Sequence, residues 1–358
     1  MDELSLLRER IASADRKIME IMARREEIAR AIGHYKLSNN IPIRNLEVEE
    51  KVVERYLDLA RGLGIGERTA VDLARVTIKD AVEVQSQIMK PSESKSILVV
   101  GGAGKMGTWL SSYFHSRGHE VMVLDPDGKT DFDRAPSLQE GIDKSDVIVV
   151  ATPMSKMAEV LLEIFELQPQ GVIFDIASIK SPIIPLLRES ASQGIKVCSV
   201  HPMFGPDAVS LYDRNVLVCD CGSREAVIVG KELFEGTGAL MLEVEVERHD
   251  ELMSFVLGLS HAVSLAFFKA LAGSGFDHQT LERAASTTFR KQMDTSRDVA
   301  FENPELYFDI QNRNPHASRA LELLGDAVDR IMESAVDGDR ESFIKIMEDG
   351  RVYFGGIE

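Results

Sequence analysis

The stretch Ile97-Leu-Val-Val-Gly-Gly-Ala-Gly-Lys-Met-Gly107 decides how this chain is organised. Four apolar residues lead into the pattern Gly102-x-Gly104-x-x-Gly107, and a segment of helical character follows over 105–117. A strand, a glycine-rich turn and a helix in this order predict the first unit of a dinucleotide-binding fold. Because the pattern starts only at residue 97, the sequence also predicts a separate domain before it.

The segment that follows alternates between strand-like and helix-like patterns, which predicts a parallel, doubly wound sheet. The expected strands are 97–100, 121–124, 147–150, 172–175 and 196–200. In the motif, Gly102 is expected to permit the tight turn, Gly104 to let the backbone approach a pyrophosphate, and Gly107 to allow close helix packing. The other residues expected at the cofactor are Lys105 and Met106 in the loop, and Thr152 and Pro153 after a later strand.

Asp125 ends the second expected strand. A carboxylate at this place bonds the ribose hydroxyls and repels a 2′-phosphate, so we expect NAD rather than NADP as the cofactor. The alternative is that Asp125 only forms the turn before Pro126-Asp-Gly128.

Composition limits the class of protein. The net charge of −17 argues against nucleic acid as a partner. All of this net charge lies in residues 91–358, because residues 1–90 hold 16 positive and 16 negative side chains. No run approaches the roughly 18 consecutive apolar residues of a membrane span, and the N-terminus lacks a signal-peptide pattern. The cysteines, Cys198, Cys219 and Cys221, lack metal-ligand spacing and are interpreted as reduced thiols. We therefore expect a cytoplasmic protein without a metal.

Residues 1–90 are predicted to form three helices. An apolar seam with helical spacing runs from Leu4 to Ile32 and predicts one helix over about 4–36. At roughly 50 Å it would be longer than such a domain is wide, so we expect a second copy of the chain to cover the seam, as a homodimer. A second helix is expected from near Glu47 with Asn45 as its cap, and a third carries a stripe that ends in Gln85 and Ile88.

Polar groups interrupt the inward faces of these helices: Arg25 and Lys36 on the first, Glu49 on the second and Gln85 on the third. Buried charges are costly unless they are paired, so the pattern predicts a pocket for a small polyanion. The alternative is that Arg25 and Lys36 extend to the surface.

The segments Leu7-Arg-Glu-Arg-Ile11, Ala23-Arg-Arg-Glu-Glu27, Gly33-His-Tyr-Lys36 and Ile78-Lys-Asp-Ala-Val-Glu-Val-Gln85 resemble the all-helical chorismate mutases. The resemblance implies that Arg25, with Arg8 of the partner subunit, holds the two substrate carboxylates. It implies that Lys36 and Gln85 donate to the ether oxygen and that Glu49 meets the ring hydroxyl. The family often has Asp, Arg and Ser where this chain has Asn45, Val48 and Ala81. Asn45 can still bond a hydroxyl, whereas Val48 cannot replace an arginine.

The segment Val200-His-Pro-Met-Phe-Gly-Pro-Asp207 leaves the last expected strand. His201 at such a strand end is well placed to polarise a hydroxyl beside a nicotinamide. Together with Asp175-Ile-Ala-Ser-Ile-Lys180, Leu259-Ser-His-Ala262 and Phe289-Arg290, this segment resembles the prephenate dehydrogenases over about 97–350. The order of the two parts resembles the bifunctional chorismate mutase–prephenate dehydrogenases of tyrosine synthesis.

This second resemblance implies a role for each matching residue. His201 would accept a hydrogen bond from the 4-hydroxyl of prephenate, and Ser178 would bond the same hydroxyl or orient His201. Arg290 would hold a substrate carboxylate, His261 would contact the pyruvyl side chain, and Asp207 would gate the site. Structural alternatives stay open: Ser178 as the cap of a helix near Ser181, Arg290 paired with Asp294, His261 as a core histidine of the helix 252–271, and His249 as structural.

These expectations give a helical mutase domain (1–90), a linker (91–96), an NAD-binding domain (97–246) and a helical substrate and dimerisation domain (247–358). The expected enzyme converts chorismate to prephenate and then, with NAD, to 4-hydroxyphenylpyruvate, and tyrosine is a candidate feedback inhibitor. One alternative is a prephenate or arogenate dehydrogenase whose N-terminal domain is inactive or regulatory. Another, of a different class, is a non-catalytic NAD-sensing helical dimer.

Overall fold

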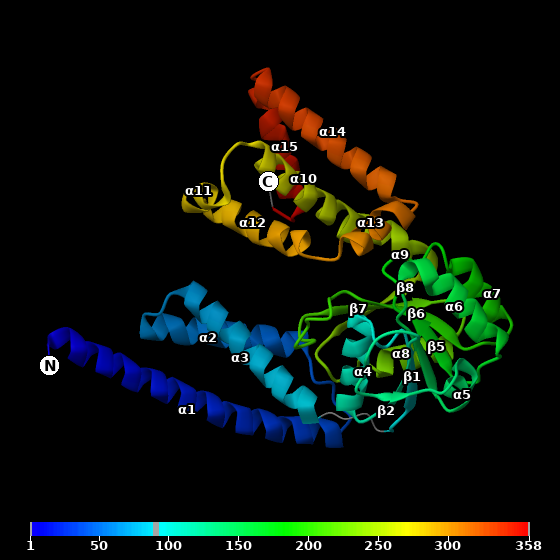
Figure 1. Cartoon of the computed structure of the whole chain (residues 1–358). Coiled ribbons are helices and arrows are strands. Elements are labelled where there is room, and N and C mark those ends of the chain that lie inside the picture. The colour runs from blue at the N-terminus through cyan, green and yellow to red at the C-terminus, as the bar shows by residue number, and fades with distance from the viewer. Residues whose placement is uncertain (1, 89–92, 357–358) are drawn as a thin grey trace. The chain divides into compact units, whose positions relative to one another are not determined.

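The computed structural model describes residues 2–88 and 93–356 (Figure 1). Contacts divide the chain into two compact units, one of Met1–Ala177 with Leu186–Val244 and one of Ser178–Pro185 with Glu245–Glu358. The break at 244–245 lies close to the boundary predicted at 246. The division at residue 90 stays a prediction, and 91–92 of the predicted linker lie outside the described residues.

Three helices open the first unit, as predicted: α1 (Glu3–Ser38), α2 (Leu46–Leu63) and α3 (Glu67–Ile88). α1 has 36 residues, which makes it roughly 54 Å long. The Asn45 side chain accepts a hydrogen bond from the Val48 amide and so caps α2, and Gly64 ends that helix in the left-handed conformation at φ 69°.

The apolar seam of α1 lies mostly in the open. Within this chain α3 packs on α1, and only Ala29 and Gly33 of α1 are buried. The large apolar side chains of the seam that stay more than two-fifths exposed are Leu4, Leu7, Ile11, Ile18, Ile21, Ile28 and Ile32. A stripe of this length exceeds the scattered apolar residues of an ordinary surface.

The nucleotide-binding part of the first unit is built on an eight-stranded sheet with the order β3-β2-β1-β4-β5-β6-β7-β8. Its strands are β1 (Ser96–Val100), β2 (Glu120–Leu124), β3 (Asp133–Arg134), β4 (Val147–Val150), β5 (Val172–Asp175), β6 (Val197–Pro202), β7 (Asn215–Asp220) and β8 (Leu240–Glu245). From β3 to β6 all neighbours are parallel. The chain order reverses between β1 and β4, and ligands of such sheets bind at the carboxyl ends of the strands there.

Two features of the sheet differ from the sequence prediction. β7 runs antiparallel to β6, and β3, β7 and β8 were not expected. β3 has only two residues, and the apolar runs of β7 and β8 lie beyond the repeated strand–helix alternation. β6 also continues past the predicted end at residue 200 to Pro202, and His201 lies at its carboxyl end, as predicted.

Helices cover the sheet: α4 (Lys105–Arg117), α5 (Leu138–Asp143), α6 (Met154–Glu166), α7 (Ile184–Ser192) and α8 (Arg224–Glu232). Strand residues that are buried on both faces form the core with Leu110 and Phe114 of α4 and Val227 of α8. α7 begins at Ile184 rather than near Ser181, so a helix at Ser181 for Ser178 to cap is not formed.

The second unit is helical after residue 245, as predicted. Its helices are α9 (Val246–Met253), the π-helical turn η1 (Ser254–Leu259), α10 (Ser260–Gly273), α11 (His278–Arg283), α12 (Thr287–Ala300), α13 (Pro304–Arg313), α14 (Ala317–Val336) and α15 (Arg340–Tyr353). α9, η1 and α10 form one continuous helix, Val246–Gly273, which is longer than the predicted 252–271. This helix is long and apolar enough to cross a membrane. A single helix of this kind is weak evidence for a membrane protein, because core helices of soluble proteins have the same length and composition.

Candidate active sites

The residues predicted to line an anion pocket lie on the three N-terminal helices. α1 supplies Arg25 and Lys36, α2 supplies Glu49, and α3 supplies Gln85. Gly33 brings α1 close to α3, because a Cβ there would lie 3.0 Å from the Ile88 side chain and 3.3 Å from that of Gln85. A larger residue at 33 would push the two polar faces apart.

Two atoms of this pocket are buried without a hydrogen-bond partner in the described part of the chain, Nε of Arg25 and Oε1 of Gln85. Gln85 is only 5% exposed. Buried polar atoms are normally satisfied, so their pairing is left to a ligand or to water. Rotation of the Gln85 amide by 180° exchanges its oxygen and nitrogen and would present the nitrogen donor in place of Oε1.

Lys36 is half-buried, and its Nζ donates to the Ile43 carbonyl oxygen at 2.5 Å. Burial lowers the pKa of Lys36, and the negative charge of Glu49 partly opposes this shift. Water screens a half-buried ammonium group less than an exposed one, so its charge acts more strongly on a bound anion.

Sequence reasoning missed Arg44. Its guanidinium donates two hydrogen bonds to the Glu49 carboxylate, Nε to Oε1 at 2.9 Å and NH2 to Oε2 at 2.7 Å. These bonds raise the pKa of Arg44 against the effect of burial. The signal available in the sequence was the spacing: Arg44 lies five positions before Glu49, whose carboxylate was predicted to face inward.

The other residues assigned to the mutase pocket are less constrained in one copy of the chain. Arg8 lies exposed on the first turns of α1. The Asn45 side-chain oxygen is engaged at the cap of α2, and Val48 is 53% exposed. A role for Asn45 therefore falls to its amide nitrogen.

The glycine loop has the close packing that the motif predicts, with one change of role. The positive φ of 82° falls on Gly101, and its missing Cβ would lie 2.9 Å from the backbone of Ala151 and Thr152. Gly102 is required instead for packing, since a Cβ would lie 2.5 Å from the Val123 side chain. At Gly107 a Cβ would lie 2.2 Å from the Gly101 carbonyl oxygen, so α4 starts close against the loop.

These contacts place the loop after β1 directly beside the loop after β4, where Thr152 and Pro153 precede α6. Gly104 caps α4 with its backbone and makes no side-chain cap, and Lys105 and Met106 begin the helix. The amides of this helix start are therefore the donors available to a pyrophosphate. The backbone amide donors at the start of α4 fit a dinucleotide, and so does the space left by the glycines of the loop, which have no side chains.

Asp125 lies at the end of β2, and its carboxylate accepts hydrogen bonds from the Ala103 amide at 3.0 Å and the Asp127 amide at 3.1 Å. The second bond is the turn interaction of the alternative interpretation. The first joins the Asp125 carboxylate to the glycine loop. The two interpretations are compatible.

His201 lies on β6, 4% exposed and opposite Leu217 of β7. The buried strand on which it lies fixes its backbone. Asp207 lies in the exposed part of the loop 203–214 that follows. Trp109 of α4 donates its Nε1–H to the Ala208 carbonyl at 2.8 Å and so ties that loop to the nucleotide-binding helix.

Three predicted residues belong to the second unit: Ser178, His261 and Arg290. His261 on α10 is 9% exposed and its ring stacks on Tyr307 with centroids 4.1 Å apart. Its Nδ1 is buried without a partner among the described residues, and burial lowers its pKa to about 4. Arg290 is exposed on the first turns of α12.

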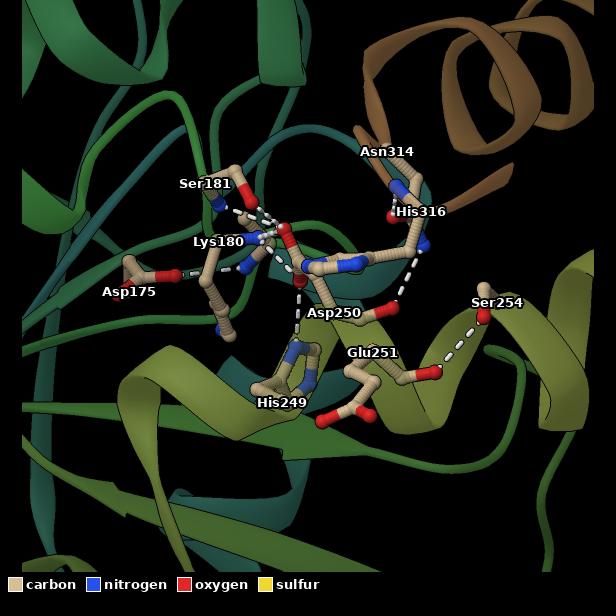
Figure 2. A network of polar contacts seen from close by, with 10 residues as sticks. Asp175, Lys180, Ser181, His249, Asp250, Glu251, Ser254, Asn314 and His316 are labelled. Carbon is tan, nitrogen blue, oxygen red and sulfur yellow. Dashed lines mark hydrogen bonds and ion pairs between the residues drawn. The ribbon is translucent and has the colours of Figure 1, made fainter. Parts of the chain in front are cut away.

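Asp250 organises the segment that carries Ser178 (Figure 2). Its carboxylate accepts hydrogen bonds from the Lys180 amide at 2.8 Å, from the Ser181 amide at 2.6 Å and from the Ser181 hydroxyl, and it contacts His249 Nδ1 at 2.7 Å. Burial raises the pKa of Asp250, but these bonds outweigh burial and hold it below the ordinary 3.8. The structural interpretation of His249 fits this network.

Comparison with known proteins follows the same division of the chain. Three family models match: chorismate mutase type II over residues 7–86, the nucleotide-binding domain of prephenate dehydrogenase over 115–243, and its dimerization domain over 245–349. The T-protein of Enterobacter agglomerans is 26% identical over 99% of this chain and 93% of its own. The 4-amino-4-deoxyprephenate dehydrogenase of Streptomyces pristinaespiralis is 31% identical over 72% of this chain and 90% of its own.

A solved structure has the same fold beyond the mutase helices. The prephenate dehydrogenase from A. aeolicus, crystallised with hydroxyphenyl propionate and NAD+, aligns with a TM-score of 0.59 over 74% of this chain and 99% of its own, at 17% identity.

Fold and site together define an NAD-dependent dehydrogenase with an added helical mutase domain. The chain belongs to the prephenate dehydrogenase family, in the form that carries a type II chorismate mutase domain at its N-terminus. It is a bifunctional enzyme of tyrosine biosynthesis, and its cofactor is NAD.

Proposed function

We propose that the helical pocket rearranges chorismate to prephenate and that the dehydrogenase part oxidatively decarboxylates prephenate to 4-hydroxyphenylpyruvate, with individual residues acting as follows. The mutase reaction has no covalent intermediate, so the pocket has to hold a compact conformer and stabilise charge on the breaking C–O bond.

In the mutase, Arg25 and Arg8 of the partner subunit hold the two carboxylates of chorismate. Lys36 and Gln85 donate to the ether oxygen, and Glu49 and Asn45 meet the ring hydroxyl. Two buried atoms without partners, Nε of Arg25 and Oε1 of Gln85, support a ligand here, on helix faces that Gly33 brings together. Arg25 can donate to a carboxylate directly, whereas the Gln85 amide has to rotate by 180° to turn its nitrogen donor to the ether oxygen. In a helical module with only a structural role, these two buried atoms without hydrogen bonds would lower the stability of the fold with no compensating function.

In the dehydrogenase, His201 accepts the proton of the prephenate 4-hydroxyl, and Ser178 bonds that hydroxyl or orients His201. Bound NAD would supply the hydride acceptor for the same carbon. Loss of the ring carboxylate as CO2 makes the ring aromatic, and His201 returns its proton to the phenolate oxygen. Arg290 holds a substrate carboxylate, His261 contacts the pyruvyl side chain, and Asp207 gates the site. His261 suits a neutral hydrogen-bonding role, because its pKa of about 4 keeps it uncharged at neutral pH.

The cofactor is held by the glycine loop and by Asp125, with Thr152 and Pro153 on the adjacent loop. The packing at Gly101, Gly102 and Gly107 leaves no room for side chains, which supports this assignment, and the acid at the end of β2 favours NAD over NADP.

The working form is proposed to be a homodimer. The exposed seam of α1 offers one self-complementary surface. The second is offered by the helix Val246–Gly273, which falls in the segment matched by the dimerization-domain model. A partner on this helix accounts for its exposed apolar side chains without a membrane. Buried cysteine thiols and soluble anionic substrates fit a cytoplasmic enzyme.

The test is an assay of both reactions in one preparation. Loss of chorismate absorbance reports the mutase, and NADH formation at about 340 nm reports the dehydrogenase, with prephenate and arogenate each tried with NAD and NADP, and with tyrosine added as the candidate inhibitor. Lys36→Ala should lower mutase kcat at least 100-fold, in line with removal of a main electrostatic donor, and leave NADH formation unchanged. His201→Asn should do the reverse.

The other functions predict different results. An inactive or regulatory helical domain gives NADH from prephenate without any turnover of chorismate. A non-catalytic NAD sensor binds NAD and forms no NADH from any of the substrates. Full turnover of prephenate by His201→Asn would contradict the role given to His201.

A further inference from the structure

Arg44 determines the orientation of the Glu49 carboxylate. Their side chains are only 12% and 17% exposed, and two nearly parallel hydrogen bonds join them. Such a fork fixes the plane of the carboxylate as well as its position. The charge of Glu49 also raises the pKa of Lys36 against the effect of burial.

The same guanidinium is held from the nucleotide-binding part of the chain. Its NH1 lies 2.9 Å from an Asp213 carboxylate oxygen and donates to the Gly238 carbonyl at 3.3 Å. The ring of Tyr212 lies under it, with the ring centre 4.6 Å from Cζ. Tyr212 also packs against the cluster of Ile43, Ile78 and Val82 from the helical segment.

Tyr212 and Asp213 end the loop 203–214, which begins where β6 ends after His201. This loop is anchored at two points, since Ala208 accepts from Trp109 and Leu211 is buried in the core of the sheet part. A second close contact lies at Gly238, where a Cβ would be 2.7 Å from the Val82 side chain. The surface that holds Arg44 is therefore joined to the core of the sheet through Leu211 and to the mutase helices through Tyr212 and Gly238.

We propose that Arg44 is a positioning residue of the mutase, and that it is kept in place by Tyr212 and Asp213 of the dehydrogenase part. The proposal rests on the role of Glu49 at the chorismate hydroxyl. It predicts that the mutase needs two residues that lie more than a hundred positions away and do not contact its substrate.

The test uses the full-length enzyme and substitutes the anchor rather than the pocket. Tyr212→Leu with Asp213→Asn removes a cation–π contact and a partly exposed ion pair, each of which contributes a modest amount. The expected result is a rise of about five-fold in the KM for chorismate. Val209→Ala, at a fully exposed position of the same loop, is the matched control and should leave the KM unchanged.

A double-mutant cycle separates positioning from general damage. Arg44→Ala should raise the KM at least ten-fold and lower kcat, and Arg44→Lys, which keeps the charge without the fork, should fall between it and the unchanged enzyme. In the Arg44→Ala background the two anchor substitutions should have no further effect on the KM. Circular dichroism and size-exclusion chromatography check that each variant is folded and dimeric.

Three results overturn the proposal: an unchanged chorismate KM in the anchor variant, the same rise with and without Arg44, or normal kinetics in Arg44→Ala. Failure of the proposed function gives a different result, because the unchanged enzyme then does not turn over chorismate at all. Mutase activity in the unchanged enzyme with normal kinetics in Arg44→Ala removes Arg44 from the mechanism and leaves the proposed function intact.

Discussion

Replacement of Asp250 by Asn should loosen the segment that carries Ser178. The Asp250 carboxylate accepts from the amides of Lys180 and Ser181 and from the Ser181 hydroxyl. An Asn keeps one acceptor oxygen and turns a donor toward these donors, so at least one charge-assisted hydrogen bond is lost. Such bonds contribute about 1.5–3 kcal/mol. We therefore expect local opening of this segment to become about 2 kcal/mol easier.

Hydrogen exchange followed by mass spectrometry measures this opening directly. Since about 1.4 kcal/mol is a factor of ten, amides in a peptide covering 178–185 should exchange about 30-fold faster in Asp250→Asn. Glu251→Gln is the matched control: it removes the same charge one residue away, from a half-exposed side chain paired with Arg248, and should change exchange little. Equal exchange of that peptide in both variants would refute the reasoning.

The pH dependence of the same variant gives a second check. The pKa of Asp250 in the folded protein lies below the ordinary 3.8. Its contribution to stability is therefore present above that value and is lost as the pH falls through the lower, folded pKa. The difference in Tm between the unchanged enzyme and Asp250→Asn should be full at pH 7 and shrink below 3.8. A constant difference across this range would contradict the assigned charge.

Three further predictions follow from single contacts. Gly107→Ala should raise the Kd for NAD at least ten-fold, since the added Cβ would lie 2.2 Å from the Gly101 carbonyl oxygen. Titration calorimetry measures this Kd. Gly62→Ala is the control, because a Cβ at residue 62 would have no atom within 4 Å. The pKa of His261 falls from 6.5 to about 4 on burial, so the unfolded chain binds the extra proton between these values and stability should fall by about 3 kcal/mol as the pH drops across them. His261→Phe should flatten that part of the Tm profile. Asp125→Ser should lower the ratio of kcat/KM for NAD to that for NADP at least ten-fold, because the repulsion of a 2′-phosphate is gone; an unchanged ratio would leave Asp125 with only its turn role.

Local pattern was enough to predict much of the fold. The apolar seam predicted α1 within two residues of its ends, Asn45 was identified as the cap of α2, and β4 and β5 have the predicted bounds. In each case the signal lies within one element, as a period, a cap or a buried apolar run.

The errors arose where an element depends on distant parts of the chain. The antiparallel β7 pairs with β6 through residues that the strand–helix alternation does not mark. α7 starts later than predicted because the turn before it is fixed by Asp250, about 70 residues away. The positive φ falls on Gly101 because the loop after β4 lies against it.

The sequence by itself determined which chemistry this protein carries. The glycine pattern after a strand, the cations at 25 and 36, and the histidine at 201 are each defined by residue type and local spacing. The tertiary structure decided how these groups are held: Glu49 in the grip of Arg44, His261 stacked on Tyr307, and the Ser178 segment tied to Asp250. The physical reason is that a hydrogen bond or ring contact depends on which surfaces folding brings together. His261 and Tyr307, like Ser181 and Asp250, are separated by tens of positions and share no local signal that would predict their contact. Arg44 and Glu49 are only five positions apart, but that spacing alone does not predict a paired geometry.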